Sequence, residues 1–335
     1  MNWKRLELWI VAGTILANAV ILFTSYTPLR YGAALLLLCV LPGLALQVRQ
    51  VRRTLALLET TALSVGAGFA VTAPLTLLLH YWPGKMSLGL ALAAYDLLIL
   101  LLLGWGVYLT PSTLRPSSLL PKGEEKGKVG GKVLLVLAAL LILAAFYRLT
   151  NLDYAEFQGD EARVMMHAAQ AIEGQEDALF KQHKGPLEAL LPMGFWLLTG
   201  TINEAQARFP FALMSLTALL GVYLLARRWF NDAVGLSATA LLAINGFFIA
   251  FGRVVQYQSF VFGLGTLALL CCERFRTEGD KTDLVLTGLL LGSGALAHYD
   301  IVAVVPAVLY LVVSGLRRSV RAQRAAALLV AGALG

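Results

Sequence analysis

The sequence is poor in charge, and this shortage restricts what the chain can be. Charged residues make up 14% of its 335 positions and hydrophobic residues 58%, whereas soluble domains carry roughly 25% charged and about 45–50% apolar residues. This composition excludes an ordinary soluble protein and indicates an integral membrane protein in contact with the lipid bilayer. Its net charge of +7 does not indicate a nucleic-acid partner, because the cations lie between apolar runs.

Cysteine is also scarce, and a cleavable signal sequence is not apparent. Cys39, Cys271 and Cys272 all lie inside apolar runs. An odd number of cysteines without ligand spacing argues against a disulfide framework and against a zinc site. The first apolar run follows Lys4 and Arg5 but has no small-residue cleavage site after it, so we interpret it as a retained helix.

Long apolar runs dominate the rest of the chain. Runs of about 16–25 residues are long enough to cross a hydrocarbon core of ~30 Å. They predict an all-α, polytopic transmembrane helix bundle with about ten complete spans, at 8–26, 31–48, 55–79, 87–109, 133–149, 208–226, 233–252, 254–272, 283–298 and 300–316. A last run at 325–335 is about half as long as a span requires, so we expect a truncated span there.

Clusters of Lys and Arg follow every second predicted span. Because cytoplasmic loops are enriched in these residues, the clusters predict that these loops and the N-terminus are cytoplasmic. We expect the membrane to be the plasma membrane. The stretch 111–132 is rich in Pro, Gly, Ser and Lys, which is typical of a linker. It divides a four-helix unit of unknown role, 1–110, from a second membrane domain, 133–335.

One acidic stretch, 151–185, interrupts the apolar runs, and the charge pattern places the surrounding region 150–207 on the extracytoplasmic side. The apolar segment 186–202 contains Pro192, and a span there would reverse every later basic loop. We therefore predict an amphipathic helix on the outer membrane face, with Pro186 at its first position.

A second surface helix is predicted to begin at Gly159-Asp160. Its apolar positions recur at helical spacing, at Ala162, Met165, Met166, Ala169 and Ile172. Asp160 then has two compatible interpretations. It is an N-cap, worth about 1 kcal/mol, or a general base or metal ligand at the membrane interface. Glu161 favours the helix dipole or takes part in the chemistry beside Asp160.

Cations around this loop suggest an anionic partner. His183 and Lys184 precede a predicted helix start, where free amide groups favour an anion such as phosphate; a solvated cation is the alternative. Arg208 and Arg253 lie on the predicted outer side, against the positive-inside bias, which indicates either an anionic ligand or simple interfacial anchoring.

Four further polar residues stand out. Tyr257 lies at the mouth of a predicted span, and His298 lies in a turn on the same predicted side; each could equally be an interfacial residue. Glu59 and Asp96 fall inside predicted spans, where an ionised Asp costs ~2.5–3.5 kcal/mol on insertion scales. Glu59 either has a functional role or extends its side chain to the membrane interface. Asp96 either has a functional role or is protonated.

The order of these motifs resembles the GT-C membrane glycosyltransferases, specifically the protein O-mannosyltransferase and aminoarabinose transferase-like families. The resemblance covers about 133–316 and rests on four motifs: Gly159-Asp160-Glu161-Ala162-Arg163, His183-Lys184-Gly185-Pro186-Leu187, Arg208-Phe209-Pro210 and Leu224-Leu225-Ala226-Arg227-Arg228-Trp229-Phe230. The chain departs from the family's basic-Pro-Pro-Leu motif at Gly185, which replaces the first proline.

The resemblance implies an inverting hexosyl- or pentosyltransferase. Such an enzyme takes a sugar from a dolichyl- or undecaprenyl-phosphate donor and passes it to a lipid, glycan or protein acceptor on the extracytoplasmic face. The resemblance assigns Asp160 as the base or as a metal ligand, with Glu161 beside it. Whether the reaction uses a divalent metal ion is left open. The donor phosphate needs cations and polar groups near the membrane interface. We therefore expect donor-phosphate or substrate binding by His183, Lys184, Arg208, Arg253, Tyr257 and His298. A transporter or lipid flippase, or a non-catalytic truncated relative, is the alternative.

Overall fold

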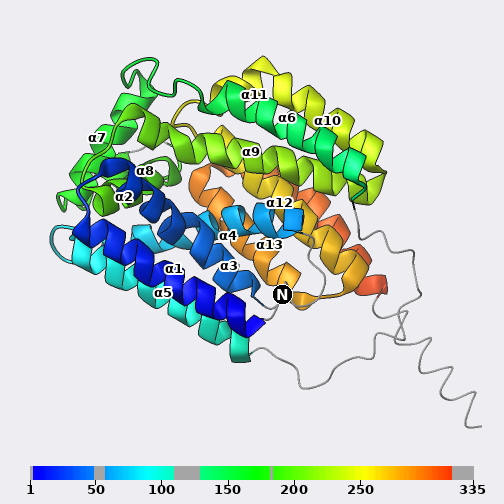
Figure 1. The fold of residues 1–335 in the computed structure, drawn as a ribbon, viewed down its shortest axis with the longest axis horizontal. Coiled ribbons are helices and arrows are strands. Elements are labelled where there is room, and N and C mark those ends of the chain that lie inside the picture. The colour runs from blue at the N-terminus through cyan, green and yellow to red at the C-terminus, as the bar shows by residue number, and fades with distance from the viewer. Residues whose placement is uncertain (1–2, 49–56, 109–128, 182–183, 319–335) are drawn as a thin grey trace, which may run out of the picture.

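A computed structural model describes residues 3–48, 57–108, 129–181 and 184–318 (Figure 1). These residues form helices and connecting loops. The helices are α1 (Trp3–Phe23), α2 (Thr27–Leu35), the π-helical turn η1 (Leu36–Val40), α3 (Leu41–Gln47), α4 (Leu57–His80), α5 (Leu88–Tyr108), α6 (Gly131–Leu149), α7 (Asp160–Ile172), the short 3₁₀ turn η3 (Leu179–Lys181), α8 (Leu187–Thr199), α9 (Glu204–Trp229), α10 (Asp232–Ile244), α11 (Gly246–Phe251), α12 (Gln258–Glu278), α13 (Lys281–Ala297) and the 3₁₀ turn η4 (Tyr299–Val304), which continues as a helix over 305–318.

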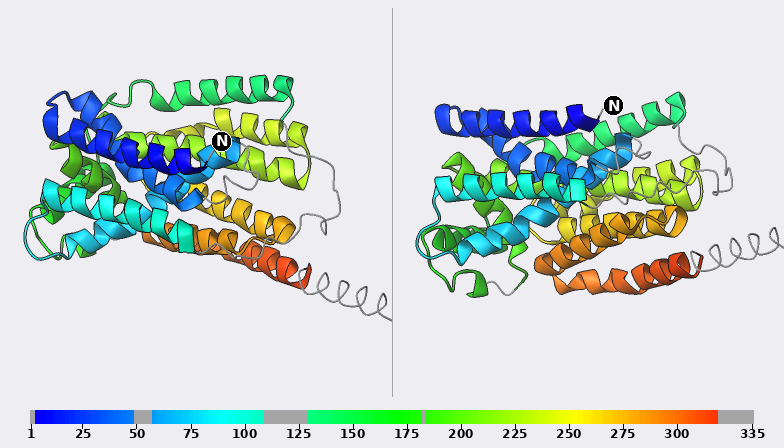
Figure 2. Two further views of the ribbon diagram at one scale, coloured as in Figure 1. Left: turned by 60° about the horizontal axis from the view of Figure 1, so that its bottom comes forward. Right: turned by 90° about the horizontal axis from the view of Figure 1, so that it is seen from below.

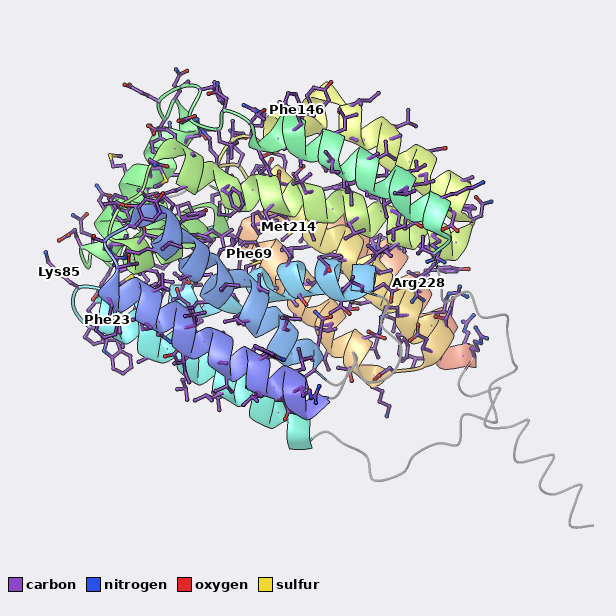
Figure 3. All side chains as sticks on the ribbon, in the orientation of Figure 1. Phe23, Phe69, Lys85, Phe146, Met214 and Arg228 are labelled. Carbon is purple, nitrogen blue, oxygen red and sulfur yellow. The ribbon has the colours of Figure 1, made fainter. Side chains whose placement is uncertain are left out.

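The long helices run roughly along one common axis (Figure 2). Lys85 marks one end of the bundle and Arg228 the other (Figure 3). Within the described ranges, seven helices are long and apolar enough to cross a membrane: Arg5–Phe23, Thr27–Gln47, Leu57–His80, Leu88–Trp105, Gly131–Leu149, Glu204–Trp229 and Tyr299–Arg318. The predicted class, an all-α polytopic bundle, is confirmed.

The other three predicted spans are also helical but less regular. Asn245 divides the predicted span 233–252, because its extended backbone ends α10 and its side chain accepts from the Phe248 amide to begin α11. α12 carries charged residues near its end, and α13 has only 17 residues. The predicted run 325–335 and most of the predicted linker lie outside the described residues, and α6 begins within that linker, at Gly131.

The helices of residues 1–110 share one core with the later helices. Buried apolar residues form a continuous cluster that includes members of α1 to α9, α12 and α13. The hydroxyl of Ser293 on α13 donates to the Ala70 carbonyl on α4 at 2.6 Å. Glycine permits a close approach of η1 and α4, because a Cβ at Gly68 would clash with the Cys39 carbonyl. These helices therefore form part of the scaffold that supports the later ones.

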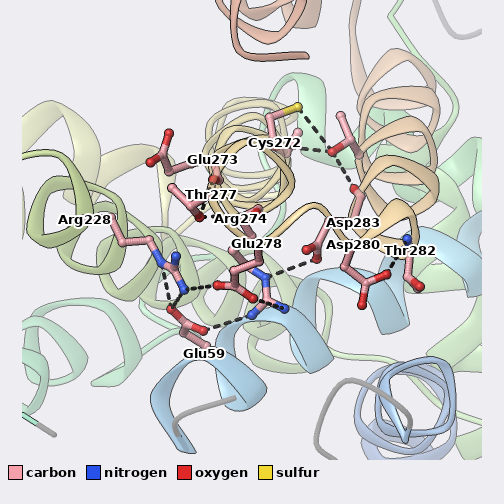
Figure 4. Close-up of polar contacts among 12 residues, drawn as sticks. Glu59, Arg228, Cys272, Glu273, Arg274, Thr277, Glu278, Asp280, Thr282 and Asp283 are labelled. Carbon is pink, nitrogen blue, oxygen red and sulfur yellow. Dashed lines mark hydrogen bonds and ion pairs between the residues drawn. The ribbon is translucent and has the colours of Figure 1, made fainter. Parts of the chain in front are cut away.

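A buried ion cluster joins four helices at the end of the bundle marked by Arg228 (Figure 4). Glu59 on α4 is 7% exposed and accepts from Arg228 on α9 at 2.7 Å and from Arg274 on α12 at 2.9 Å. Arg274 also donates to Asp283 on α13 at 3.1 Å. Glu59 therefore does not snorkel; buried charges need paired partners, and its two arginines provide them.

Asp96 is likewise satisfied by a neighbouring helix. The Asn18 amide on α1 donates to both carboxylate oxygens of Asp96 on α5, at 2.8 and 3.0 Å. Polar contacts of this kind between membrane helices contribute roughly 0.6–2 kcal/mol each. The contact accounts for a polar residue within this span without a transport role.

Candidate active site

The predicted site residues gather at the end of the bundle that Lys85 marks. They come from the start of α7, the turn before α8, the start of α9, the segment before α12 and the turn after α13. Lys85, in the loop between α4 and α5, forms an ion pair with Glu173, and the Met86 amide donates to the Ile172 carbonyl at 3.2 Å. These contacts attach the end of α7 to the N-terminal helices.

Asp160 is the first residue of α7, and Gly159, with φ of 53°, is its N-cap. The predicted N-cap role of Asp160 is therefore wrong by one position. Its carboxylate accepts from the Lys184 ammonium at 2.8 Å, and 45% of its side chain is exposed. The hydrogen bond from Lys184 and its positive charge lower the pKa of Asp160. Asp160 is therefore ionised at neutral pH and open to a ligand, as a general base must be.

Glu161 points inward and pairs with Arg208 on α9. The guanidinium donates to both carboxylate oxygens, at 3.0 and 2.7 Å, and the two side chains are 7% and 1% exposed. Glu161 also accepts from the Val255 amide at 2.8 Å. Arg208 donates further to the carbonyls of Leu152 and Ala155, at 2.6 and 2.9 Å. The pair thus holds the acidic loop, α9 and the segment before α12 together.

This pairing explains which face of α7 is buried. The predicted apolar face is partly wrong, because Ala162 and Met166 are exposed. Besides Met165 and His167, the buried residues are spaced from Glu161 at helical intervals, at Val164, Ala168 and Ala171. Glu161 must face Arg208, and residues at i+3, i+7 and i+10 then share that face. The buried ion pair overrides the apolar pattern.

Arg253 caps a helix end. Its guanidinium donates to three backbone carbonyls at the end of α6, those of Tyr147 (2.7 Å), Thr150 (2.9 Å) and Asn151 (2.9 Å). The ring of Tyr154, which the sequence did not single out, lies 4.9 Å from the Arg208 guanidinium and 5.4 Å from that of Arg253. Both arginines therefore have their donors engaged around the acidic loop.

Lys184, Tyr257 and His298 form a row beside Asp160. The Lys184 ammonium lies 5.6 Å from the centre of the Tyr257 ring, and that ring stacks on His298 at 3.9 Å and 10°. The His298 ring nitrogen Nδ1 lies 3.1 Å from the Asp300 carboxylate. His183 lies outside the described residues. The row presents one cation next to an aromatic surface.

Glu188 is a further charged residue that the sequence prediction missed. It lies in the first turn of α8, is 1% exposed, and accepts from the Tyr257 amide at 2.6 Å. Burial alone would lower the pKa of Lys184, but its hydrogen bond to the Asp160 carboxylate and the negative charge of Glu188 raise it. Its position as an acidic residue inside the otherwise apolar segment 186–202 is the sequence feature that could have identified Glu188.

α8 does not lie on the surface as predicted, although it begins after Pro186 and is too short to be a span candidate. Every side chain in it except that of Trp196 is buried, against α2, α4, α5, α7, α9 and α13. The N-terminal helices cover the face that would otherwise contact lipid. α8 is therefore a core element, and the turn before it is held rigidly.

Gly185 fits this turn because nothing larger would. A Cβ there would clash with the carbonyl oxygens of Leu296 and Ala297 at the end of α13. The glycine brings the backbone beside Lys184 against the residues that precede His298. The replacement of the motif's first proline by Gly185 therefore allows a close contact between this turn and the end of α13.

We expect Gly185→Ala to destabilise the fold, because the added methyl group must push the turn before α8 away from the end of α13. Overpacking of this kind costs about 1–3 kcal/mol. Thermal unfolding of the purified protein in detergent measures this loss. Gly292→Ala on α13 is the matched control, since nothing lies within 4 Å of its added Cβ. Equal unfolding temperatures for the two variants would contradict the close contact at Gly185.

A metal site is not formed by side chains alone in the described part of the chain. No three His, Cys, Asp or Glu side chains there lie close enough together to hold a metal ion. Asp160 presents an exposed carboxylate, so a divalent ion bound jointly with a ligand would have one protein oxygen available.

Comparison with known proteins adds one finding. The family model described as dolichyl-phosphate-mannose-protein mannosyltransferase matches residues 183–335. The match supports a relationship to the GT-C glycosyltransferases and points to a membrane glycosyltransferase with a polyprenyl-phosphate sugar donor. Neither the curated proteins nor the solved structures give a match. The matched range contains Lys184 and Arg208 but not their partners Asp160 and Glu161. The contact of Lys184 with Asp160 and that of Arg208 with Glu161 therefore connect the matched part of the chain to the unmatched part.

Proposed function

We propose that the protein transfers a sugar from a polyprenyl-phosphate donor to an acceptor hydroxyl, with Asp160 as the general base. The observation that carries this proposal is the 2.8 Å contact between Asp160 and Lys184. It places an exposed, ionised carboxylate beside a cation with aromatic neighbours. A base for the acceptor and a cation for the donor phosphate are then within reach of one sugar-phosphate group.

The proposed reaction is a single direct displacement. Asp160 accepts the proton of the acceptor hydroxyl as its oxygen attacks the anomeric carbon from the face opposite the phosphate. The bond between that carbon and the phosphate oxygen breaks, and its electrons leave with polyprenyl phosphate. Lys184 stabilises the charge that develops on the phosphate. The configuration at the anomeric carbon inverts, and proton and charge balance without a general acid.

The residues with engaged donors have positioning roles in this proposal. Glu161 and Arg208 fix the start of α7 and thereby Asp160, and Arg253 fixes the chain that leads from α6 into the acidic loop. Tyr257 and His298 retain a binding role, because their stacked rings lie beside Lys184. Flat aromatic surfaces of this kind bury the apolar face of a sugar or the first isoprenoid unit.

The distribution of arginine supports an extracytoplasmic site. Arginines at the end of α9, the end of α12 and the end of the helix over 305–318 gather opposite the site. Since Lys and Arg are enriched on the cytoplasmic side of membrane proteins, that end faces the cytoplasm. The site then faces the outside of the plasma membrane, where the acceptor is a lipid, glycan or protein.

Sugar transfer in membranes that contain the full chain tests the proposal. We expect transfer from a polyprenyl-phosphate sugar, with release of polyprenyl phosphate, and none from the nucleotide sugar. Lys184→Met should raise the donor KM roughly 10- to 150-fold, the worth of a hydrogen bond to a charged group. Lys181→Met is the control, because Lys181 forms an exposed pair with Asp177 nearby.

Two outcomes would overturn the proposal. Lipid or solute flux in proteoliposomes without any sugar transfer would assign the chain to transport. Transfer with unchanged donor KM in Lys184→Met would remove the phosphate-binding role from this lysine.

A further inference from the structure

A cavity of about 370 Å³ lies at the end of the bundle opposite the candidate active site, where α9, α12 and the helix over 305–318 meet. Its polar lining consists of Trp229, Glu273, Arg276, Tyr310 and Ser314, and Leu311 contributes to its apolar wall. Trp229 follows Arg208 by 21 positions on α9, and at a rise of 1.5 Å per residue the two are about 30 Å apart. The cavity is thus separate from the candidate active site.

The cavity is lined by donors without partners. Arg276 uses Nε and Nη2 to hold both oxygens of Glu273, each at 2.7 Å, and Glu273 is 1% exposed. Glu273 points away from the Glu59 cluster (Figure 4). Within the described residues, the Arg276 Nη1 group, the Trp229 indole N–H and the Tyr310 hydroxyl make no side-chain hydrogen bond. The Arg276 guanidinium neutralises the Glu273 carboxylate, and the remaining donors around the cavity favour an anion.

The surroundings also favour an anion at a lipid surface. Arg317 and Arg318 are exposed and follow Ser314 by about one helical turn, and neither has a carboxylate partner in the described part of the chain. Basic groups beside a membrane attract anionic lipids. Trp229 and Tyr310 are 43% and 71% exposed, as is usual for aromatic side chains at the membrane–water boundary.

We propose that this cavity binds the phosphate-bearing headgroup of an anionic membrane phospholipid. The phosphate accepts from Arg276, Trp229 and Tyr310, and the acyl chains lie along the exposed apolar residues Val302 and Leu309 of the last described helix. A free phosphate ion would leave this apolar surface unused. The lipid ties the ends of three helices together on the side of the membrane opposite the candidate site.

Lipid binding to the purified full chain, measured by native mass spectrometry, tests the proposal. Phosphatidylglycerol should bind more tightly than phosphatidylcholine. Trp229→Phe with Tyr310→Phe removes two donors but keeps an aromatic ring at each position. It should weaken phosphatidylglycerol binding roughly 10- to 150-fold for each hydrogen bond lost to the charged phosphate. Tyr81→Phe with Trp82→Phe, an exposed pair at the other end, should leave binding unchanged.

Three results would overturn the assignment: equal binding of the two lipids, equal binding by the two double variants, or displacement of the lipid by millimolar inorganic phosphate. Thermal unfolding of each variant without lipid checks that its fold is intact. The test does not depend on sugar transfer, so failure of the proposed enzymatic function would leave its result interpretable.

Discussion

Asp160→Asn is expected to lower kcat for sugar transfer by about 10²- to 10⁴-fold, the usual contribution of a general base. The amide has the shape of the carboxylate but does not accept a proton. Because 45% of the Asp160 side chain is exposed, the substitution should leave thermal unfolding nearly unchanged. Initial rates of transfer, measured at saturating donor in membranes with equal amounts of each variant, check the prediction.

Asp177→Asn is the matched control for this experiment. Asp177 lies in the same acidic stretch, pairs with Lys181 at 2.8 Å and is 66% exposed, so the same chemical change breaks an equivalent lysine contact away from the site. Its kcat should equal that of the wild type. A wild-type rate in Asp160→Asn, or an equal loss in both variants, would remove Asp160 from the mechanism.

The positions of most helices can be predicted from the sequence, because each helix that crosses the membrane needs an apolar run of about 20 residues, and such runs are visible in the sequence. The start of α7 after Gly159 also follows, because glycine acts locally. The start of α8 follows to within one residue, since Pro186 is its N-cap and not its first residue as predicted. Burial of α8 does not follow. It depends on helices far away in the chain that cover a face which an isolated helix would offer to lipid.

The candidate site shows the same division between local and distant causes. Asp160 and Lys184 are each recognisable from a local motif, but their contact depends on the packing of Gly185 against the end of α13. Arg208 and Arg253 were predicted as ligands of an anion because of their placement along the chain. Their actual partners, Glu161 and the carbonyls after α6, are residues to which no sequence spacing points.

Glu161→Gln is expected to destabilise the fold by about 3–5 kcal/mol, the cost of leaving one partner of a buried ion pair unpaired. The glutamine keeps the shape and one acceptor oxygen, but the Arg208 charge, 1% exposed, loses its counterion. Thermal unfolding of the purified protein in detergent measures this loss. Glu173→Gln is the control: Glu173 forms an exposed pair with Lys85, and such pairs contribute about 0–1 kcal/mol.

A double-mutant cycle separates this structural role of Glu161 from a catalytic one. If Glu161 acts by holding α7 against α9, Arg208→Met in the Glu161→Gln background should cost much less than in the wild type, since the stranded charge is gone. The donor KM and kcat of Glu161→Gln, measured below its unfolding temperature, should then change less than those of Asp160→Asn. Additive losses of stability in the cycle, or a kcat as low as that of Asp160→Asn, would instead place Glu161 among the reacting groups.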